Sequence, residues 1–374
     1  MSNLVRNAPW TRSVSSLSRS AQNFPDNRFM RRLRSSVLRK YNGQIDPNHF
    51  VYVIDDTANP KYSGNAFNAG AWHGSSGPWF GQKVMVLALV DKKRGISIPI
   101  GYIIAAKEGV LDHKTGPDMA IELLKQTIGE DWPSLPVVFD SWFDSKDLME
   151  KVEELGLTYC GELKGNRNVK DSTSENPNWA SLPDAFKGCS RSRLYTCFDS
   201  EKIKKRLKRS KVGAHLQIYI KNRKTPLNAI AVYNRRNGKK AFGYYVTTDL
   251  SMSGAKIWEI SRARWKIEVM FRDLKQNLSF GRLPSAGESN AHLAVCIPFL
   301  ILTSLRLSSG KHWDFQSETM TIGDQVDQIR ESALVKSIDY LVVRQNIDVI
   351  KTLKSRRALS RLNKKPVNRL AEAA

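Results

Sequence analysis

Three short runs of aliphatic and β-branched residues follow one another from Phe50 on, and they set the strongest limit on the fold. Their sequences are FVYVID, KVMVLALV and ISIPIGYIIAA, and glycine, proline and charged residues separate them, as turns separate neighbouring strands. Helical and strand patterns then alternate over Asp118–Ile128, residues 136–140, residues 145–156 and the run LTYCGELKG. This order predicts an α/β domain that begins with three adjacent strands.

The pattern changes between about Gly165 and Asp249, where short stretches alternate apolar with polar residues. LYTCF, HLQIYI, NAIAVYN and AFGYYVTT each predict a strand, so this part is expected to be a β-rich insertion. After it, apolar residues recur at helical spacing from Ser253 to Leu278, and Gly281 follows them. We expect one long amphipathic helix there.

Five parts are therefore expected along the chain. They are a basic N-terminal arm or short helix over residues 1–48, the first part of the core over 49–164, the β-rich insertion over 165–250, the second part of the core over 251–310, and a basic C-terminal region over 311–374. The second core part includes the apolar stretch Ala291–Leu307. This stretch is short for a membrane span and contains Pro298, which favours a buried helix.

The charge balance indicates a polyanionic partner. Lysine and arginine number 59 against 36 acids, a formal charge of +23, which is far more than solubility requires. Seven of the ten residues in KIKKRLKRSK, at 202–211, are basic, among them Lys204, Lys205 and Arg206. Such a run can follow a phosphate backbone, and it can equally be a solvated loop. A membrane is the less favoured partner, because no lipidation motif accompanies the charge.

The cysteines indicate neither zinc nor disulfides. No two of them have the short spacing of zinc-binding pairs; they are Cys160, Cys189, Cys197 and Cys296. We expect core thiols in a reducing cytosol, and hence a cytoplasmic protein.

Two acids stand where apolar strands end. In VYVIDDT, Val51, Val53 and Asp55 project to one side of a strand, and Asp140 closes the run PVVF. An acid in a buried strand is costly unless a cation or hydrogen-bond donors meet it, which favours a functional role. Each aspartate could instead cap the turn that follows it.

A third acid lies in the segment SRARWKIEVMFRDLK. Arg264, Glu268, Arg272 and Lys275 form one stripe along the expected helix. Taken alone, a glutamate between basic residues is typical of a solvated, ion-paired helix face.

Taken together, VIDDT, FDSWFD and RARWKIEVMFRDLK resemble the DDE transposases of bacterial insertion sequences, in the branch called the insertion sequence four family. The signature of that branch is Tyr, two residues, Arg, three residues, Glu, six residues and Lys. Arg264, Glu268 and Lys275 match this spacing, and Ser261 stands at the tyrosine position. The resemblance covers roughly residues 50–310.

The other two motifs of the family select the aspartates. Threonine or serine follows the first acid after one residue, which selects Asp55 with Thr57 over Asp56. The second acid belongs to an Asp, three residues, Asp pattern, which Asp140 and Asp144 match.

The resemblance implies a ribonuclease H-like core with a β-rich domain inserted before the glutamate helix, an order that the strand count also gives. It implies that Asp55, Asp140 and Glu268 hold two Mg²⁺ ions, for which Mn²⁺ can substitute. Further implied contacts are to DNA phosphates. Their residues are Arg264, Arg272 and Lys275, with Ser261 in place of tyrosine and Lys204, Lys205 and Arg206 in the insertion.

The expected activity is cleavage and strand transfer of double-stranded DNA, with a dimer bridging two transposon ends in a bacterial cytoplasm. Family members commonly carry a helical end-binding domain before the core, and about fifty residues precede Phe50, so end recognition is expected to be reduced, moved to the C-terminal tail or lost by truncation. Two alternatives stay open: a ribonuclease H-like nuclease with another DNA substrate, and an inactive DNA-binding relic.

Overall fold

The structure is a computed structural model, and it divides the chain into two compact units. One unit is Arg19–Ser309, and the other combines Met1–Ser18 with Gly310–Ala374. The described residues are 24–61, 64–74, 77–109, 112–128, 132–173, 178–187, 189, 194–196, 211–234, 241–283, 285–307 and 320–332. The second unit is represented by residues 320–332, which are helical from 322. The elements below all belong to the first unit.

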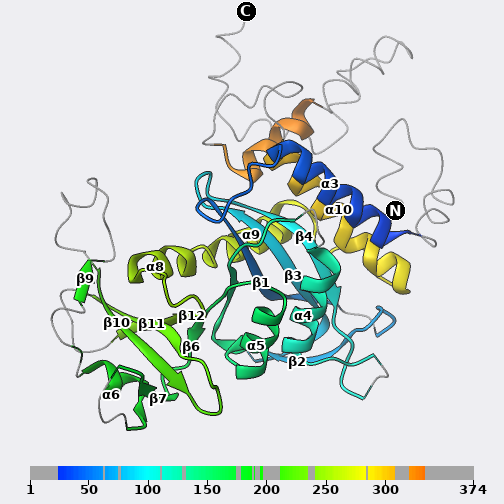
Figure 1. Ribbon diagram of the computed structural model, residues 1–374. Coiled ribbons are helices and arrows are strands. Elements are labelled where there is room, and N and C mark those ends of the chain that lie inside the picture. The colour runs from blue at the N-terminus through cyan, green and yellow to red at the C-terminus, as the bar shows by residue number, and fades with distance from the viewer. Residues whose placement is uncertain are drawn as a thin grey trace, which may run out of the picture. The chain divides into compact units, whose positions relative to one another are not determined.

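The three apolar runs are adjacent strands, as predicted, and they pair antiparallel. They are β1 (Phe50–Pro60), β3 (Gly77–Asp91) and β4 (Ile96–Ile104), and β3 lies between the other two. β5 (Val137–Phe139) pairs in parallel with β1, and β6 (Tyr159–Leu163) in parallel with β5. The first part of β3 also forms a hairpin with β2 (Gly70–Gly74), which the sequence did not predict. The fold is therefore a mixed α/β fold (Figure 1).

Helices cover both faces of this sheet (Figure 1), which is why the residues of β1 from Phe50 to Ile54 are buried without alternation. α4 (Gly116–Thr127) and α5 (Lys146–Glu154) lie on one face. Their N-termini are capped by the side chains of Thr115 and Ser145, which accept hydrogen bonds from backbone N–H groups.

The strands after β6 continue the same sheet. They are β7 (Asn168–Asp171), β8 (Ala180–Ser181), β9 (Leu194–Thr196), β10 (Lys211–Ile220), β11 (Leu227–Asn234) and β12 (Ala241–Thr247), with α6 (Leu182–Lys187) after β8. The four alternating stretches correspond to β9 to β12. β12 pairs with β6, with Val246 opposite Gly161, so the polypeptide returns to the core before the next helices begin. Arg223, in the turn after β10, is buried and pairs with Glu153 of α5 at 2.6 Å.

The single helix predicted over Ser253–Leu278 is wrong, because the structure has two helices there. They are α8 (Gly254–Arg262) and α9 (Trp265–Asn277). At the junction the N–H groups of Ala263, Lys266 and Ile267 donate to the carbonyls three residues earlier. The hydroxyl of Ser261 also donates to the Ile257 carbonyl at 2.8 Å, an arrangement that bends helices.

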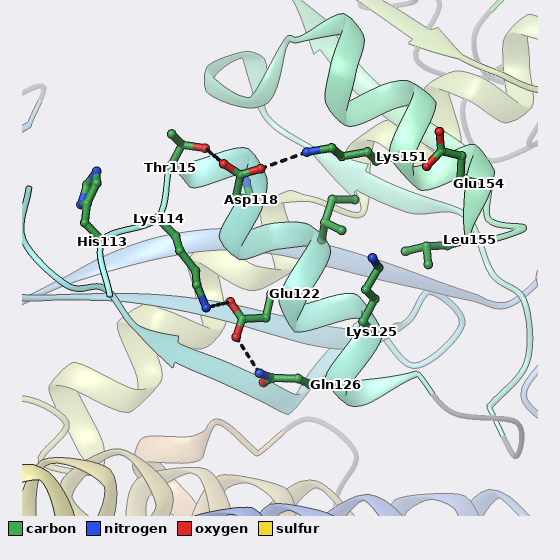
Figure 2. A pocket seen from close by; sticks show the side chains of 11 residues that line it. His113, Lys114, Thr115, Asp118, Glu122, Lys125, Gln126, Lys151, Glu154 and Leu155 are labelled. Atoms are coloured by element: carbon green, nitrogen blue, oxygen red, sulfur yellow. Dashed lines mark hydrogen bonds and ion pairs between the residues drawn. The ribbon is translucent and has the colours of Figure 1, made fainter. Parts of the chain in front are cut away.

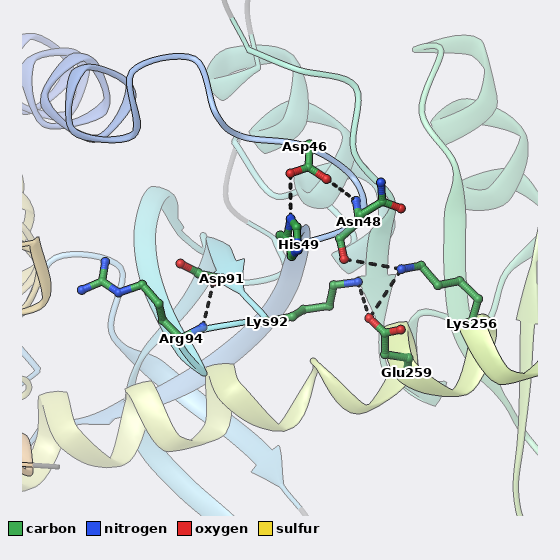
Figure 3. Close-up of polar contacts among 8 residues, drawn as sticks. All are labelled: Asp46, Asn48, His49, Asp91, Lys92, Arg94, Lys256 and Glu259. Atoms are coloured by element: carbon green, nitrogen blue, oxygen red, sulfur yellow. Dashed lines mark hydrogen bonds and ion pairs between the residues drawn. The ribbon is translucent and has the colours of Figure 1, made fainter. Parts of the chain in front are cut away.

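Contacts on both sides of this junction hold it against the sheet. Figure 3 shows Lys92, after β3, paired with Glu259 of α8 at 2.6 Å, while Lys256 donates to the Asn48 carbonyl at 3.4 Å. Beyond the junction, the Ser97 hydroxyl of β4 donates to the Lys266 carbonyl at 2.7 Å. Arg264, between these anchors, therefore has a fixed backbone position.

The predicted apolar face of the second helix is confirmed. The predicted residues Ile267, Phe271, Leu274 and Leu278 are all buried, and so is Met270. α10 (Glu288–Leu307) then packs against β4, together with α3 (Asp26–Tyr41) from the basic N-terminal segment. By length and composition alone α10 could cross a membrane, and half of its most apolar window is buried inside the protein.

The thiols agree with their predicted character as far as the structure describes them. Cys160 and Cys296 are buried and free, and Cys189 is half-buried. Cys197 lies outside the described residues.

Candidate active site

The strand register places three carboxylates in one row. Val53 of β1 is opposite Val138 of β5, and Asp55 and Asp140 each follow two residues further on, close enough for their carboxylates to repel each other. Phe139 is likewise opposite Gly161 of β6, which brings Glu162 beside Asp140. Side chains at equivalent positions of neighbouring strands lie on the same face of the sheet. The row therefore runs from Asp55 through Asp140 to Glu162.

Glu162 was missed in the sequence. The run YCGEL carries an acid inside an otherwise buried strand, and the same reasoning selected Asp55, so the sequence did contain a signal for Glu162.

Arg264 joins this row to the glutamate of α9. Its Nη1 atom lies 2.7 Å from Oε1 of Glu268 and 3.6 Å from Oδ2 of Asp55. Its charge also opposes the effect of burial on the pKa values of Asp140 and Glu162. The guanidinium is thus a shared cation within a cluster of carboxylates.

The carboxylates of the row are nevertheless short of positive charge. The side chain of Asp55 is only 15% exposed, and burial, then repulsion from Asp140 and Asp56, raises the pKa of Asp55 to about 7 despite the nearby Arg264. Burial also raises the pKa of Asp140, against a hydrogen bond that its carboxylate accepts from the Trp142 N–H at 2.9 Å. An additional cation at this site would relieve both groups.

The neighbouring acids of the two motifs have cations of their own. Asp56 pairs with Lys83 of β3 at 2.8 Å. Asp144 is buried and accepts hydrogen bonds from Nε and Nη2 of Arg167 at 2.9 and 2.8 Å. These pairs satisfy Asp56 and Asp144 within the fold, which distinguishes them from Asp55 and Asp140.

The chemistry of the donor set fits a magnesium or manganese ion. Carboxylate oxygens are the ligands that these ions prefer, and the row lacks positive charge. Among the described residues, no three His, Cys, Asp or Glu side chains gather closely enough to hold a metal ion. The position between Asp55 and Glu268 belongs to the guanidinium of Arg264 instead.

The other predicted contact residues differ in their surroundings. Arg272 is exposed and follows Glu268 by one helical turn. Lys275 is half-buried, burial lowers the pKa of its ammonium group, and within the described part of the chain it makes no hydrogen bond or ion pair. Ser261 is buried and its hydroxyl donates inside the helix. Lys204, Lys205 and Arg206 lie outside the described residues.

Two exposed tryptophans adjoin the site residues in sequence. Trp142, two residues after Asp140, is 68% exposed, and Lys164 Nζ lies 5.5 Å from its ring centroid. Trp265, directly after Arg264, is 58% exposed. Sequence reasoning overlooked both, although FDSWFD and RARWKIE contain them. By contrast, the rings of Trp72 and Trp79 stack on each other across the β2–β3 hairpin, with centroids 6.2 Å apart.

A cavity of about 830 Å³ lies against α4 and α5 and shares no residue with the carboxylate row (Figure 2). Three lysines and three acids line it, and four of these form ion pairs: Lys114 with Glu122 at 2.6 Å, and Lys151 with Asp118 at 3.0 Å. Because these charges balance, the cavity offers no comparable site for a metal ion or a phosphate.

Comparison with known proteins gives one family match. The model of the transposase DDE domain matches residues 51–303. A cryo-EM structure of the piggyBac transposase synaptic complex with hairpin DNA is similar at 17% identity and a TM-score of 0.41, over 83% of this chain and 55% of that one. The crystal structure of the C-terminal lobe of a budding yeast Argonaute follows at 11% identity and a TM-score of 0.23, over 77% and 54%. The chain spans about half the length of each. None of the curated proteins matches the sequence.

Proposed function

The chain belongs to the transposase DDE domain family, and from this membership we propose that it is the transposase of a bacterial insertion sequence. Its activity would be metal-dependent cleavage of double-stranded DNA at the ends of the element, followed by strand transfer into a target. The observation that carries the proposal is that Arg264 joins Asp55 to Glu268, beside Asp140 on a row of acids that is short of positive charge.

In this proposal Asp55, Asp140 and Glu268 would hold two Mg²⁺ ions, or Mn²⁺ in their place. When bound, the ions activate water or a 3′ hydroxyl and neutralise charge on the leaving oxygen. The protein orients these carboxylates before a metal ion binds, since the Trp142 N–H fixes the Asp140 carboxylate and burial restricts the side chain of Asp55.

The basic and aromatic side chains next to these acids would bind the DNA. Arg264, Arg272 and Lys275 follow one stripe with Glu268, so the three cations can contact successive phosphates near the cleaved bond. A half-buried ammonium that has no partner in the described part of the structure, as in Lys275, gains most from a phosphate. The exposed rings of Trp142 and Trp265 offer faces on which unpaired bases can stack.

The finer classification is also part of the proposal. A ribonuclease H-like core is supported by the order of three antiparallel strands, two parallel strands and a later glutamate helix, with the insertion placed before that helix. The insertion sequence four branch is supported by the spacing of Arg264, Glu268 and Lys275.

Assembly and location follow from the same proposal. Cutting both ends of an element in one complex requires at least two copies of the chain, so we expect a dimer on DNA in the bacterial cytoplasm, associated with the nucleoid. Sizing of the protein with and without end DNA tests this, and a single stoichiometry under both conditions would contradict it.

The activity is tested on a supercoiled plasmid that carries the ends of the element, with Mg²⁺ or Mn²⁺. We expect the native chain to nick and join this DNA, and Glu268→Gln to bind without cutting. Glu150→Gln, the same change on an exposed face of α5, is the matched control and should cut. If both the native chain and the control bind but do not cut, the chain is a DNA-binding relic. If they cut without regard to the ends, it is a nuclease with another substrate.

A further inference from the structure

The cation between Asp55 and Glu268 belongs to the protein itself. Arg264 reaches Glu268 at 2.7 Å and Asp55 at 3.6 Å through the same Nη1 atom. These carboxylate oxygens face the guanidinium, and a metal ion would need the same oxygens. The guanidinium carries a single positive charge, and this charge also lowers the pKa values of the Asp140 and Glu162 carboxyl groups, which burial raises.

The surroundings of Arg264 limit what can move. Its backbone lies in the tightened junction between α8 and α9, and the contacts of Glu259 and Lys266 hold the helices on either side. The side chain is partly exposed, so its long stem can change rotamer while the backbone stays in place. If another cation replaces Arg264 at these carboxylates, the Arg264 side chain therefore has to move while its backbone stays in place.

Two other cations beside the site residues already have partners. Lys83 pairs with Asp56, and Lys164 lies over the ring of Trp142. Arg264 is thus the charge that a divalent cation would have to replace at Asp55 and Glu268.

We propose that Arg264 is the internal counter-ion of the metal-free site, and that a divalent cation displaces it from Asp55 and Glu268 and so releases it to bind a DNA phosphate. This inference rests on the proposed function, because it takes Asp55 and Glu268 as metal ligands. A guanidinium suits both roles, since its planar fork binds carboxylate and phosphate alike. Metal loading and phosphate binding are thereby coupled through one side chain.

The first test measures Mn²⁺ binding to the full chain without DNA, by the loss of the free Mn²⁺ signal in electron paramagnetic resonance. Arg264→Gln is expected to bind Mn²⁺ about tenfold more tightly than the native chain, because the competing cation is gone. Arg264→Lys retains a competing charge and should bind like the native chain. Arg262→Gln removes one charge two residues away and should change the affinity by less than about threefold.

Equal or weaker Mn²⁺ binding by Arg264→Gln overturns the exchange and leaves the proposed function intact. If neither the native chain nor Arg264→Gln binds Mn²⁺, the proposed metal site fails, and the exchange fails with it. Circular dichroism of each variant establishes that it is folded, and Arg264→Lys provides a folded comparison that keeps the charge.

The second test measures whether Arg264 is released to bind a DNA phosphate. Affinity for a DNA duplex is determined over a range of salt concentrations, with and without Ca²⁺ as a divalent ion of low catalytic competence. In the native chain Ca²⁺ should steepen the salt dependence by about one phosphate contact, a slope change of about 0.9. In Arg264→Gln this change should be absent. The same Ca²⁺-dependent change in both proteins overturns the release of Arg264.

Discussion

Replacing Asp55 by asparagine should stabilise the metal-free protein at neutral and alkaline pH. Burial and the neighbouring carboxylates raise the pKa of Asp55 from 3.8 to about 7 in the folded chain. Its ionised form is therefore unfavourable in the fold. Asparagine has nearly the same shape and carries no charge, so it removes that penalty.

The size of the effect follows from proton linkage. Because the folded pKa of Asp55 is the higher one, its protonation favours folding below pH 3.8, and this contribution is lost as the pH rises through about 7. At pH 8 the difference between the two pKa values corresponds to about 4 kcal/mol. Movement of side chains and entry of water reduce it, so we expect Asp55→Asn to gain about 2 to 4 kcal/mol.

Urea unfolding in EDTA between pH 4 and pH 8 measures this gain. The native chain should lose stability across this range, and Asp55→Asn should lose less. Asp56→Asn is the matched control, because Asp56 has its own partner in Lys83, and we expect a change within about 1 kcal/mol. The reasoning is refuted if Asp55→Asn is no more stable than the native chain at pH 8, or if both show the same pH dependence.

Three further outcomes are expected. Glu153→Gln leaves the buried guanidinium of Arg223 without its partner and should lower the unfolding free energy by about 2 kcal/mol, measured by urea unfolding. Asp273→Asn breaks the buried pair with Arg306, at 2.8 Å, and should cost about 3 kcal/mol in the same assay. Trp142→Ala should weaken binding of single-stranded end DNA about tenfold by fluorescence anisotropy while leaving Mn²⁺ affinity unchanged; a loss of Mn²⁺ binding would contradict its assignment to DNA.

The strands of the core could be predicted because each is a short apolar run between turn residues. Asp55 and Asp140 stood out for the same reason, since each ends such a run. That they lie close to each other depends on the register between β1 and β5, which no local pattern specifies. Their role as metal ligands stays a prediction.

The helix over Ser253–Leu278 shows where local patterns stop being sufficient. Its apolar spacing correctly gave the buried face, and the four-residue spacing of Arg264 and Glu268 anticipated their contact. The break between α8 and α9 depends on hydrogen bonds three residues apart, which leave the apolar spacing almost unchanged. The contact of Arg264 with Asp55 joins distant segments, so sequence spacing could not supply it.

The most direct test of the account is the position of bound Mn²⁺ in crystals of the full chain with end DNA, located by anomalous scattering. The account predicts two peaks, about 4 Å apart, bound by Asp55, Asp140 and Glu268, with the Arg264 guanidinium moved to a phosphate. Peaks at other side chains, or no peak at these carboxylates at saturating Mn²⁺, would contradict it.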